Sequence, residues 1–214
     1  MNLIIIFSIT PIALLIGVLI GINYYNYLNK IGLILLFYLC INLTIDIIGK
    51  LMYYYEINNV TLFNIVGISE IIIFSIFYLN ILKNKKLIYF LSSIGVIYSL
   101  VEIVLINSQN IVSFQSYAKV ISAFIIITIS LYYIMNQLLR EKEIELKQLV
   151  FVIISYFSLE LIFLLPLNFL VNNTSNLVVY IWLFRLSCNL LFYSFLIYTL
   201  WKNGKTQKQL SSGL

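Results

Sequence analysis

The hydrophobic positions of this chain form long runs that short polar stretches separate. Seven runs each approach the ~20 residues that an α-helix needs to cross about 30 Å of hydrocarbon. These runs are Leu3–Ile20, Ile31–Tyr54, Thr61–Leu82, Leu87–Ile106, Phe114–Gln137, Leu149–Val171 and Leu177–Trp201. The pattern predicts an all-α membrane protein, a bundle of seven transmembrane helices over residues 1–201. We expect residues 202–214 to form a short, basic, disordered tail.

Composition narrows the class of protein further. Of 214 residues, 62% are hydrophobic and 10% are charged, which is far from the usage of soluble domains. The chain contains no histidine, so histidine-based zinc sites and Ser-His-Asp catalysis are excluded. Its two cysteines lie inside apolar runs and form no CxxC motif. We therefore expect no metal, no cofactor and no disulfide framework.

Basic residues alternate between the predicted connections and explain the net charge of +5 without a nucleic-acid partner. The N-terminus and the loops Glu56–Val60, Asn107–Ser113 and Asn172–Asn176 contain no Lys or Arg. The other connections and the tail contain Lys30, Lys83, Lys85, Lys86, Arg140, Lys142, Lys147, Lys202, Lys205 and Lys208. The positive-inside rule then places the N-terminus outside and the C-terminus in the cytoplasm. Frequent Ile, Asn, Lys and Tyr indicate an AT-rich bacterial genome, and hence the bacterial inner membrane.

The fifth loop, LLREKEIELKQ, is the only sizeable polar segment between the helices. Its good helix formers predict that the fifth helix continues into the cytoplasm. One interpretation is a solvated helical turn. The other is a surface for a cytoplasmic signalling partner, formed by Arg140, Lys142 and Lys147.

An acidic residue, Glu70, lies near the middle of the apolar run Thr61–Leu79. A charge at the bilayer centre costs at least ~2.5–3.5 kcal/mol, so such a side chain faces protein or a water-filled cavity. Asn64, Gly67 and Glu70 share one stripe at 100° per residue, together with Phe74. We expect this stripe to face the interior of the bundle.

Other predicted helices also contain isolated polar residues. The expected orientation places one group in the outer half of the membrane: Asp46, Lys50, Glu102, Lys119 and Arg185. It places a second group near the midplane: Glu70, Glu160 and Asn189. Lys50 and Glu102 lie near helix ends and can extend to water. The inner half is predicted to be almost purely apolar and aromatic.

Two interpretations of these polar residues remain open. Buried pairs such as Glu70–Arg185 or Glu160–Lys119 can be architectural. Alternatively, an outer-half cavity binds a small anionic or amphiphilic ligand, which Arg185 and Lys119 hold and which Glu70 and Asn189 orient. The full predicted ligand site is Asp46, Asn64, Glu70, Lys119, Glu160, Arg185 and Asn189.

The function that we expect is a non-enzymatic receptor or sensor in the lipid bilayer. One alternative is a small-solute or proton-coupled transporter, with Glu70 and Glu160 as carriers near the midplane. Another is an intramembrane lipid hydrolase that uses paired carboxylates, with Glu70 and Glu160 as a general acid–base pair and Asp46 as a further candidate. No catalytic sequence motif supports the hydrolase.

Three segments carry a resemblance to a known group of proteins. They are the second helix with Asp46, the stretch LFNIVGISE in the third helix, and RLSCNLLFYS in the last. In these segments and in its overall layout the chain resembles small, uncharacterised seven-helix membrane proteins of Bacteroidota. That resemblance implies a sensory or signalling role. Its size and helix number are also similar to those of lysoplasmalogenase-like membrane enzymes, without a residue-by-residue match.

Overall fold

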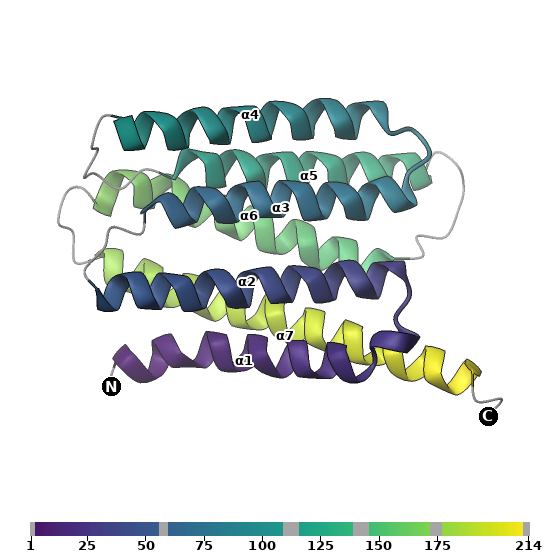
Figure 1. The fold of residues 1–214 in the computed structure, drawn as a ribbon. Helices are drawn as coiled ribbons and strands as arrows, with labels where there is room; N and C mark the ends of the chain where they lie inside the picture. The colour runs from purple at the N-terminus through teal and green to yellow at the C-terminus, as the bar shows by residue number, and fades with distance from the viewer. Residues whose placement is uncertain (1–2, 56–59, 109–115, 139–145, 172–176, 212–214) are drawn as a thin grey trace. The chain divides into compact units, whose positions relative to one another are not determined.

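The computed structural model describes residues 3–55, 60–108, 116–138, 146–171 and 177–211. Within these ranges the chain forms seven α-helices and one short 3-10 helix, η1, and no strand. The elements are α1 (Leu3–Asn23), η1 (Tyr25–Tyr27), α2 (Lys30–Tyr54), α3 (Val60–Ile81), α4 (Lys86–Ser108), α5 (Tyr117–Leu138), α6 (Lys147–Leu170) and α7 (Leu177–Ser211). Figure 1 shows these helices and the order in which the chain visits them.

Six helices, α2 to α7, are long and apolar enough to cross a membrane. In α1 the apolar stretch whose side chains the structure describes is Ile9–Asn23, which is shorter than the six other helices. Large apolar side chains on these helices are exposed, including Phe90, Phe151 and Phe169. An exposed apolar surface along whole helices is typical of contact with lipid. The structure therefore agrees with a multi-pass membrane protein, in which most of the predicted helix boundaries lie within a few residues of the observed ones.

The helices form two compact units, which we describe separately. Unit 1 comprises Met1–Glu56 and Leu186–Leu214, and unit 2 comprises Ile57–Arg185. Helix α7 therefore begins in unit 2 and continues in unit 1.

In unit 2, α5 packs against α3, α4 and α6, and α3 also packs against α4. Helices α3 and α5 approach each other closely at Gly67, where a Cβ atom would lie 3.2 Å from the Ala118 carbonyl oxygen and 3.2 Å from Lys119 Cα. Further along α3 from this crossing, the core of unit 2 contains aromatic side chains. Phe74 of α3 meets Phe157 of α6 edge to face, with ring centroids 5.2 Å apart. The crossing at Gly67 brings the polar residues of α3 and α5 together.

In unit 1, α1 packs against α2, and glycines of α1 allow close contact with both α2 and α7. Gly17 lies against Ile197 and Leu39, and Gly21 lies against Leu36 and Leu200. Helix α2 begins at an ordinary N-cap, because the Asn29 side chain accepts a hydrogen bond from the Gly32 amide at 2.8 Å.

The end of the chain differs from our expectation. We expected residues 202–214 to be disordered, but α7 continues as a helix to Ser211. For residues 202–211 the disorder prediction was wrong, because it considered the polar sequence KNGKTQKQ alone, and residues 212–214 lie outside the described residues. In the structure Gly204 is buried and packs on Tyr24, so the added turns gain tertiary contacts.

Candidate functional site

The centre of unit 2 contains a buried ion pair between Glu70 of α3 and Lys119 of α5. Each of the two side chains is only 1% exposed. Ser122, on the same helix as Lys119, donates a hydrogen bond to Glu70 Oε2 at 3.3 Å. The Lys119 ammonium also lies 5.9 Å from the centre of the Phe157 ring. The sequence places Lys119 and Ser122 on one face of α5, because residues three apart are neighbours on a helix.

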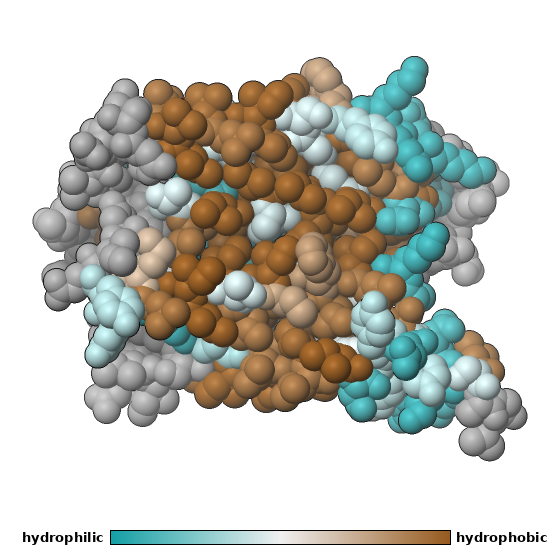
Figure 2. All heavy atoms as spheres, viewed as in Figure 1, coloured by the Kyte–Doolittle hydropathy of each residue, from teal (hydrophilic) through white to brown (hydrophobic). Residues whose placement is uncertain are grey.

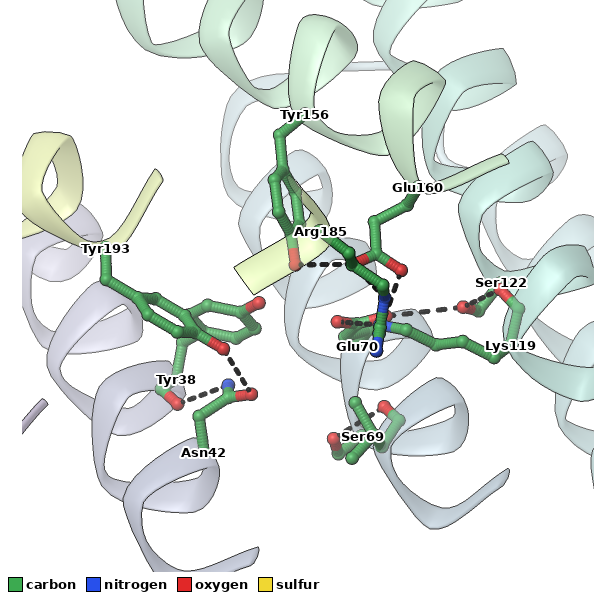
Figure 3. A network of polar contacts seen from close by, with 11 residues as sticks. Tyr38, Asn42, Ser69, Glu70, Lys119, Ser122, Tyr156, Glu160, Arg185 and Tyr193 are labelled. Atoms are coloured by element: carbon green, nitrogen blue, oxygen red, sulfur yellow. Dashed lines mark hydrogen bonds and ion pairs between the residues drawn. The ribbon is translucent and has the colours of Figure 1, made fainter. Parts of the chain in front are cut away.

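A second buried ion pair joins Glu160 of α6 to Arg185 of α7 (Figure 3). The guanidinium donates from Nε to Glu160 Oε1 and from Nη2 to Glu160 Oε2, each at 3.1 Å. The Tyr156 hydroxyl donates to Glu160 Oε1 at 3.2 Å from one turn earlier on α6. This bidentate arrangement is the strongest form of carboxylate recognition by arginine.

Aromatic rings surround the Arg185 guanidinium. Its central carbon lies 5.1 Å from the Trp182 ring centre and 5.6 Å from the Phe63 ring centre. Both distances are within the range of a cation–π interaction. Arg185 is 8% exposed, so its charge is stabilised by Glu160 and by these rings rather than by bulk solvent.

The two ion pairs interact and form one group, which we call the charge network: Glu70, Lys119, Glu160 and Arg185. Each of the two carboxylates interacts electrostatically with both cations, and Glu70 also interacts with the Glu160 carboxylate. Four helices supply its members, and the formal charges cancel. Cancellation matters because a single unpaired ion in this environment carries a desolvation penalty of several kcal/mol, on the order of 3–5 kcal/mol when one partner is removed.

The partners within the charge network differ from the pairs that the sequence suggested. We predicted Glu70–Arg185 or Glu160–Lys119, and the direct contacts are Glu70–Lys119 and Glu160–Arg185. Helical periodicity indicates which face of a helix is polar, but it does not give the rotation and shift between two helices. These two quantities decide which charges meet.

Glu102 also differs from our expectation. Its position near a helix end predicted a side chain that extends to water, but Glu102 is only 6% exposed. Its Oε1 atom accepts a hydrogen bond from the Tyr117 amide at 3.0 Å. Tyr117 is the first residue of α5, where the backbone amides have no partner within the helix. Glu102 therefore caps α5 from a neighbouring helix.

Asn168 of α6 binds Ser116, the residue that precedes α5. It was not among the predicted site residues. Its Oδ1 atom accepts hydrogen bonds from the Ser116 amide at 2.9 Å and the Ser116 hydroxyl at 3.0 Å. The only signal in the sequence is an amide residue within an apolar run. Nothing in the chain pattern connects it to Ser116, 52 positions away.

Asn64 is fully buried near Glu102, on the stripe of α3 that also contains Gly67 and Glu70. Neither its amide nitrogen nor its amide oxygen makes a hydrogen bond of good geometry, and the same is true of Glu102 Oε2. An unsatisfied buried polar atom costs about 1–3 kcal/mol. The predicted burial of Asn64 is confirmed, and its side chain lies close enough to Glu102 to interact with that carboxylate.

The half of unit 2 nearest the α3–α4 junction is less apolar than expected. The Tyr78 and Ser130 hydroxyl oxygens lie 2.6 Å apart, and Ser75 and Ser92 also form a hydrogen bond. These hydroxyls join α3 to α5 and α3 to α4. Tyrosine and serine in apolar runs do not reveal such pairs, because the sequence does not show which hydroxyls of neighbouring helices meet.

The remaining predicted site residues lie elsewhere. Asp46 and Asn189 belong to unit 1, where Asp46 forms an ion pair with Lys50 at 3.6 Å. Unit 1 has its own buried polar contact, in which the Tyr193 hydroxyl donates to Asn42 Oδ1 at 3.2 Å (Figure 3). Of the predicted partner surface, Arg140 and Lys142 lie outside the described residues, and Lys147 begins α6.

Among the residues that the structure describes, no three His, Cys, Asp or Glu side chains form a group that could hold a metal ion. No protein-family model, curated protein or solved structure matches this chain. The resemblance to the Bacteroidota proteins stays a prediction, and the charge network is the observation on which a function can be based.

Proposed function

We propose that this chain is a receptor-like protein of the bacterial inner membrane that binds a small anionic or amphiphilic ligand at the charge network and catalyses no reaction. The supporting observation is the contact between Arg185 and Glu160. The guanidinium binds a carboxylate in the bidentate geometry that it would also use for the carboxylate of a ligand. Glu160 would then compete with the carboxylate of the ligand for the Arg185 guanidinium.

Exchange of one carboxylate for another is the physical basis of the proposal. A ligand anion at Arg185 keeps the number of charge-assisted hydrogen bonds on the guanidinium, and Phe63 and Trp182 offer apolar surface for its hydrocarbon part. The displaced Glu160 keeps the Lys119 charge nearby. Binding shifts the protein between two states only if the ligand has different affinities for them.

The orientation of the protein in the membrane is part of the same proposal. In unit 2, Lys83, Lys85 and Lys86 lie at the junction of α3 and α4. Figure 2 shows hydrophilic residues gathered at this junction and hydrophobic residues over the middle of the helices. By the positive-inside rule this end faces the cytoplasm. A cytoplasmic partner would then meet the surface that contains Lys147 and, from the sequence, Arg140 and Lys142.

The test is a comparison of octanoate, an amphiphilic anion, with the neutral octanol of the same chain length. We expect octanoate to raise the melting temperature of the detergent-solubilised protein and octanol to have little effect. Arg185→Met should abolish the octanoate effect. Tyr156→Phe should enhance it, because this change removes a hydrogen bond that holds Glu160 in place.

The variant Glu160→Gln sharpens the test. Removal of the internal competitor should increase the affinity for octanoate, whereas an architectural network predicts no octanoate binding in any variant. Lys50→Met is the control, since it removes a cation from unit 1 that is part of the ion pair with Asp46. Equal responses of wild type and Arg185→Met to octanoate would contradict the proposal.

A second candidate function, proton-coupled transport of a small solute, is favoured by the proximity of two buried carboxylates. Glu70 and Glu160 interact electrostatically, so a proton on one of them changes the charge balance at the other. The measurement is solute uptake into proteoliposomes driven by a pH gradient. Uptake that Glu70→Gln abolishes would support transport. A lipid hydrolase has less support, because a cation neutralises each of these carboxylates.

A further inference from the structure

The C-terminal turns of α7 are fixed to the connection between α1 and α2. The Asn29 amide donates a hydrogen bond to Asn203 Oδ1 at 3.3 Å. Gly204 faces Tyr24 so closely that a Cβ atom at this position would lie 2.6 Å from Tyr24 Cβ. A helix that continues beyond the apolar run and is held in this way presents its remaining side chains in fixed directions.

Five side chains near the end of α7 form a stripe on one side of the helix. We call it the aromatic–lysine stripe, and its members are Tyr198, Trp201, Lys202, Lys205 and Lys208. At 100° per residue they fall within an arc of about 120°. The Tyr198 and Trp201 ring centres are 6.1 Å apart, and Lys205 Nζ lies 5.0 Å from the Trp201 ring centre. Lys208 Nζ lies 5.8 Å from the centre of the Tyr27 ring.

Among the described residues of unit 1, no carboxylate forms an ion pair with the lysines of the stripe. The sequence contains no Asp or Glu after Glu160. In the described part of unit 1 the only acidic residue is Asp46, which pairs with Lys50. Lys202, Lys205 and Lys208 are exposed, and Figure 2 shows hydrophilic residues gathered over the C-terminal turns of α7. Within the described part of unit 1, this surface is therefore a positive patch without an acidic partner, and it begins at two aromatic rings.

The spacing along the helix matches the layers of a bilayer. Trp201 is 38% exposed and Tyr198 is 53% exposed, and both rings border the apolar part of α7. Tryptophan and tyrosine concentrate where hydrocarbon meets headgroups. With a rise of about 1.5 Å per residue, the three lysines lie roughly 1.5–10 Å beyond Trp201 along the helix. The headgroup layer on each side of the hydrocarbon is about 5–8 Å thick.

We propose that the aromatic–lysine stripe is a binding site for the headgroup of an anionic phospholipid. The lysines bind the anionic phosphate, while Trp201 and Tyr198 contact the glycerol and the upper acyl chains. An acidic protein would match the lysines but would not account for aromatic rings in register with the apolar surface. The site goes beyond the proposed receptor function and does not depend on the charge network.

The experiment measures lipid binding to the delipidated protein by native mass spectrometry, with phosphatidylglycerol and phosphatidylcholine titrated separately. We expect tighter binding of phosphatidylglycerol. Each lysine near an anionic surface contributes about a fivefold change in affinity. The triple variant Lys202→Gln, Lys205→Gln and Lys208→Gln should therefore bind phosphatidylglycerol at least tenfold more weakly and phosphatidylcholine as before.

The matched control is the triple variant Lys83→Gln, Lys85→Gln and Lys86→Gln, which removes the same charge from unit 2. Its affinity for phosphatidylglycerol should stay within twofold of wild type. Equal losses in the two triple variants would overturn the proposal, because general charge would then explain the binding. If either triple variant fails to fold, the single variants Lys202→Gln and Lys205→Gln test the proposal instead. Each of them should bind phosphatidylglycerol several-fold more weakly than wild type.

Two competitors separate the lipid from other anions. Glycerol 3-phosphate, which has no acyl chains, should not displace phosphatidylglycerol at millimolar concentration. A polyglutamate peptide should also fail. Displacement by glycerol 3-phosphate would assign the stripe to a soluble phosphate compound, and displacement by the peptide alone would assign it to an acidic protein. Either result overturns the lipid proposal.

Discussion

Arg185 donates two hydrogen bonds of 3.1 Å to the two oxygens of the Glu160 carboxylate, and both side chains are almost fully buried. The contact joins α6 to α7 inside unit 2. Its energetics are asymmetric, because removal of one partner leaves the other as a buried, unpaired charge.

The first prediction concerns this asymmetry. Arg185→Met should lower the free energy of unfolding by about 3 kcal/mol, and the double variant Arg185→Met/Glu160→Gln should lose less than the single variant. The measurement is reversible denaturation in mixed detergent micelles. A double variant that is less stable than Arg185→Met would show that the contacts of Glu160 with Tyr156 and Lys119 outweigh the cost of its unpaired charge.

A second prediction follows from the proximity of the two ion pairs. Removal of either cation alone also relieves the repulsion between Lys119 and Arg185, whereas removal of both, in Lys119→Met/Arg185→Met, relieves that repulsion only once. The loss of stability should therefore exceed the sum of the two single losses by at least about 0.5 kcal/mol. A double-mutant cycle measures this coupling. Losses that simply add would mean that the two ion pairs are energetically independent.

Gly67 provides a third prediction, because its neighbours are backbone atoms of α5. Gly67→Ala should push α3 and α5 apart and lower stability by about 1–3 kcal/mol. Gly95→Ala is the control. Its added Cβ would overlap with Ile125 Cδ1 and lie 2.9 Å from Ile71 Cδ1, which are side-chain ends that shift more easily than the backbone of α5. We expect the control to be the milder change, and a larger effect at Gly95 would contradict the close crossing at Gly67.

The cap on α5 gives a fourth prediction. Glu102→Ala removes the acceptor of the Tyr117 amide and should lower the free energy of unfolding by about 1–2 kcal/mol. Glu102→Gln keeps an oxygen in that position and should retain most of the stability. Hydrogen exchange at the Tyr117 amide reports the same contact directly. Equal destabilisation by Ala and Gln would mean that the charge of Glu102, rather than its hydrogen bond, is what matters.

The proposed orientation yields a fifth prediction. A reporter that fluoresces only in the cytoplasm should be active when fused to the C-terminus, and a periplasmic phosphatase should be inactive there. A single cysteine at Lys85, in a variant without Cys40 and Cys188, should be labelled by a membrane-impermeant maleimide only after the cells are opened. Labelling of intact cells would reverse the orientation.

Sequence patterns predicted the helices of this protein well, because the length and hydropathy of each helix are properties of its own residues. The same patterns predicted that Glu70, Asn64 and Glu160 are buried. They failed where the outcome depends on a second helix, as in the partners of Lys119 and Arg185. They also failed for Glu102 and Gly204, whose surroundings are supplied by Tyr117 and Tyr24 from other elements.

The order of the network members along the chain has a consequence for how the protein is made. Glu70 emerges from the ribosome long before Lys119, and Glu160 emerges before Arg185. Each carboxylate is therefore synthesised before the cation that pairs with it, and an unpaired carboxylate within the hydrocarbon layer is costly. A nascent chain that stops before residue 185 would leave Glu160 without its partner. Arg185 is thus the last member of the charge network to be synthesised, and the formal charges of the network cancel only when it is present.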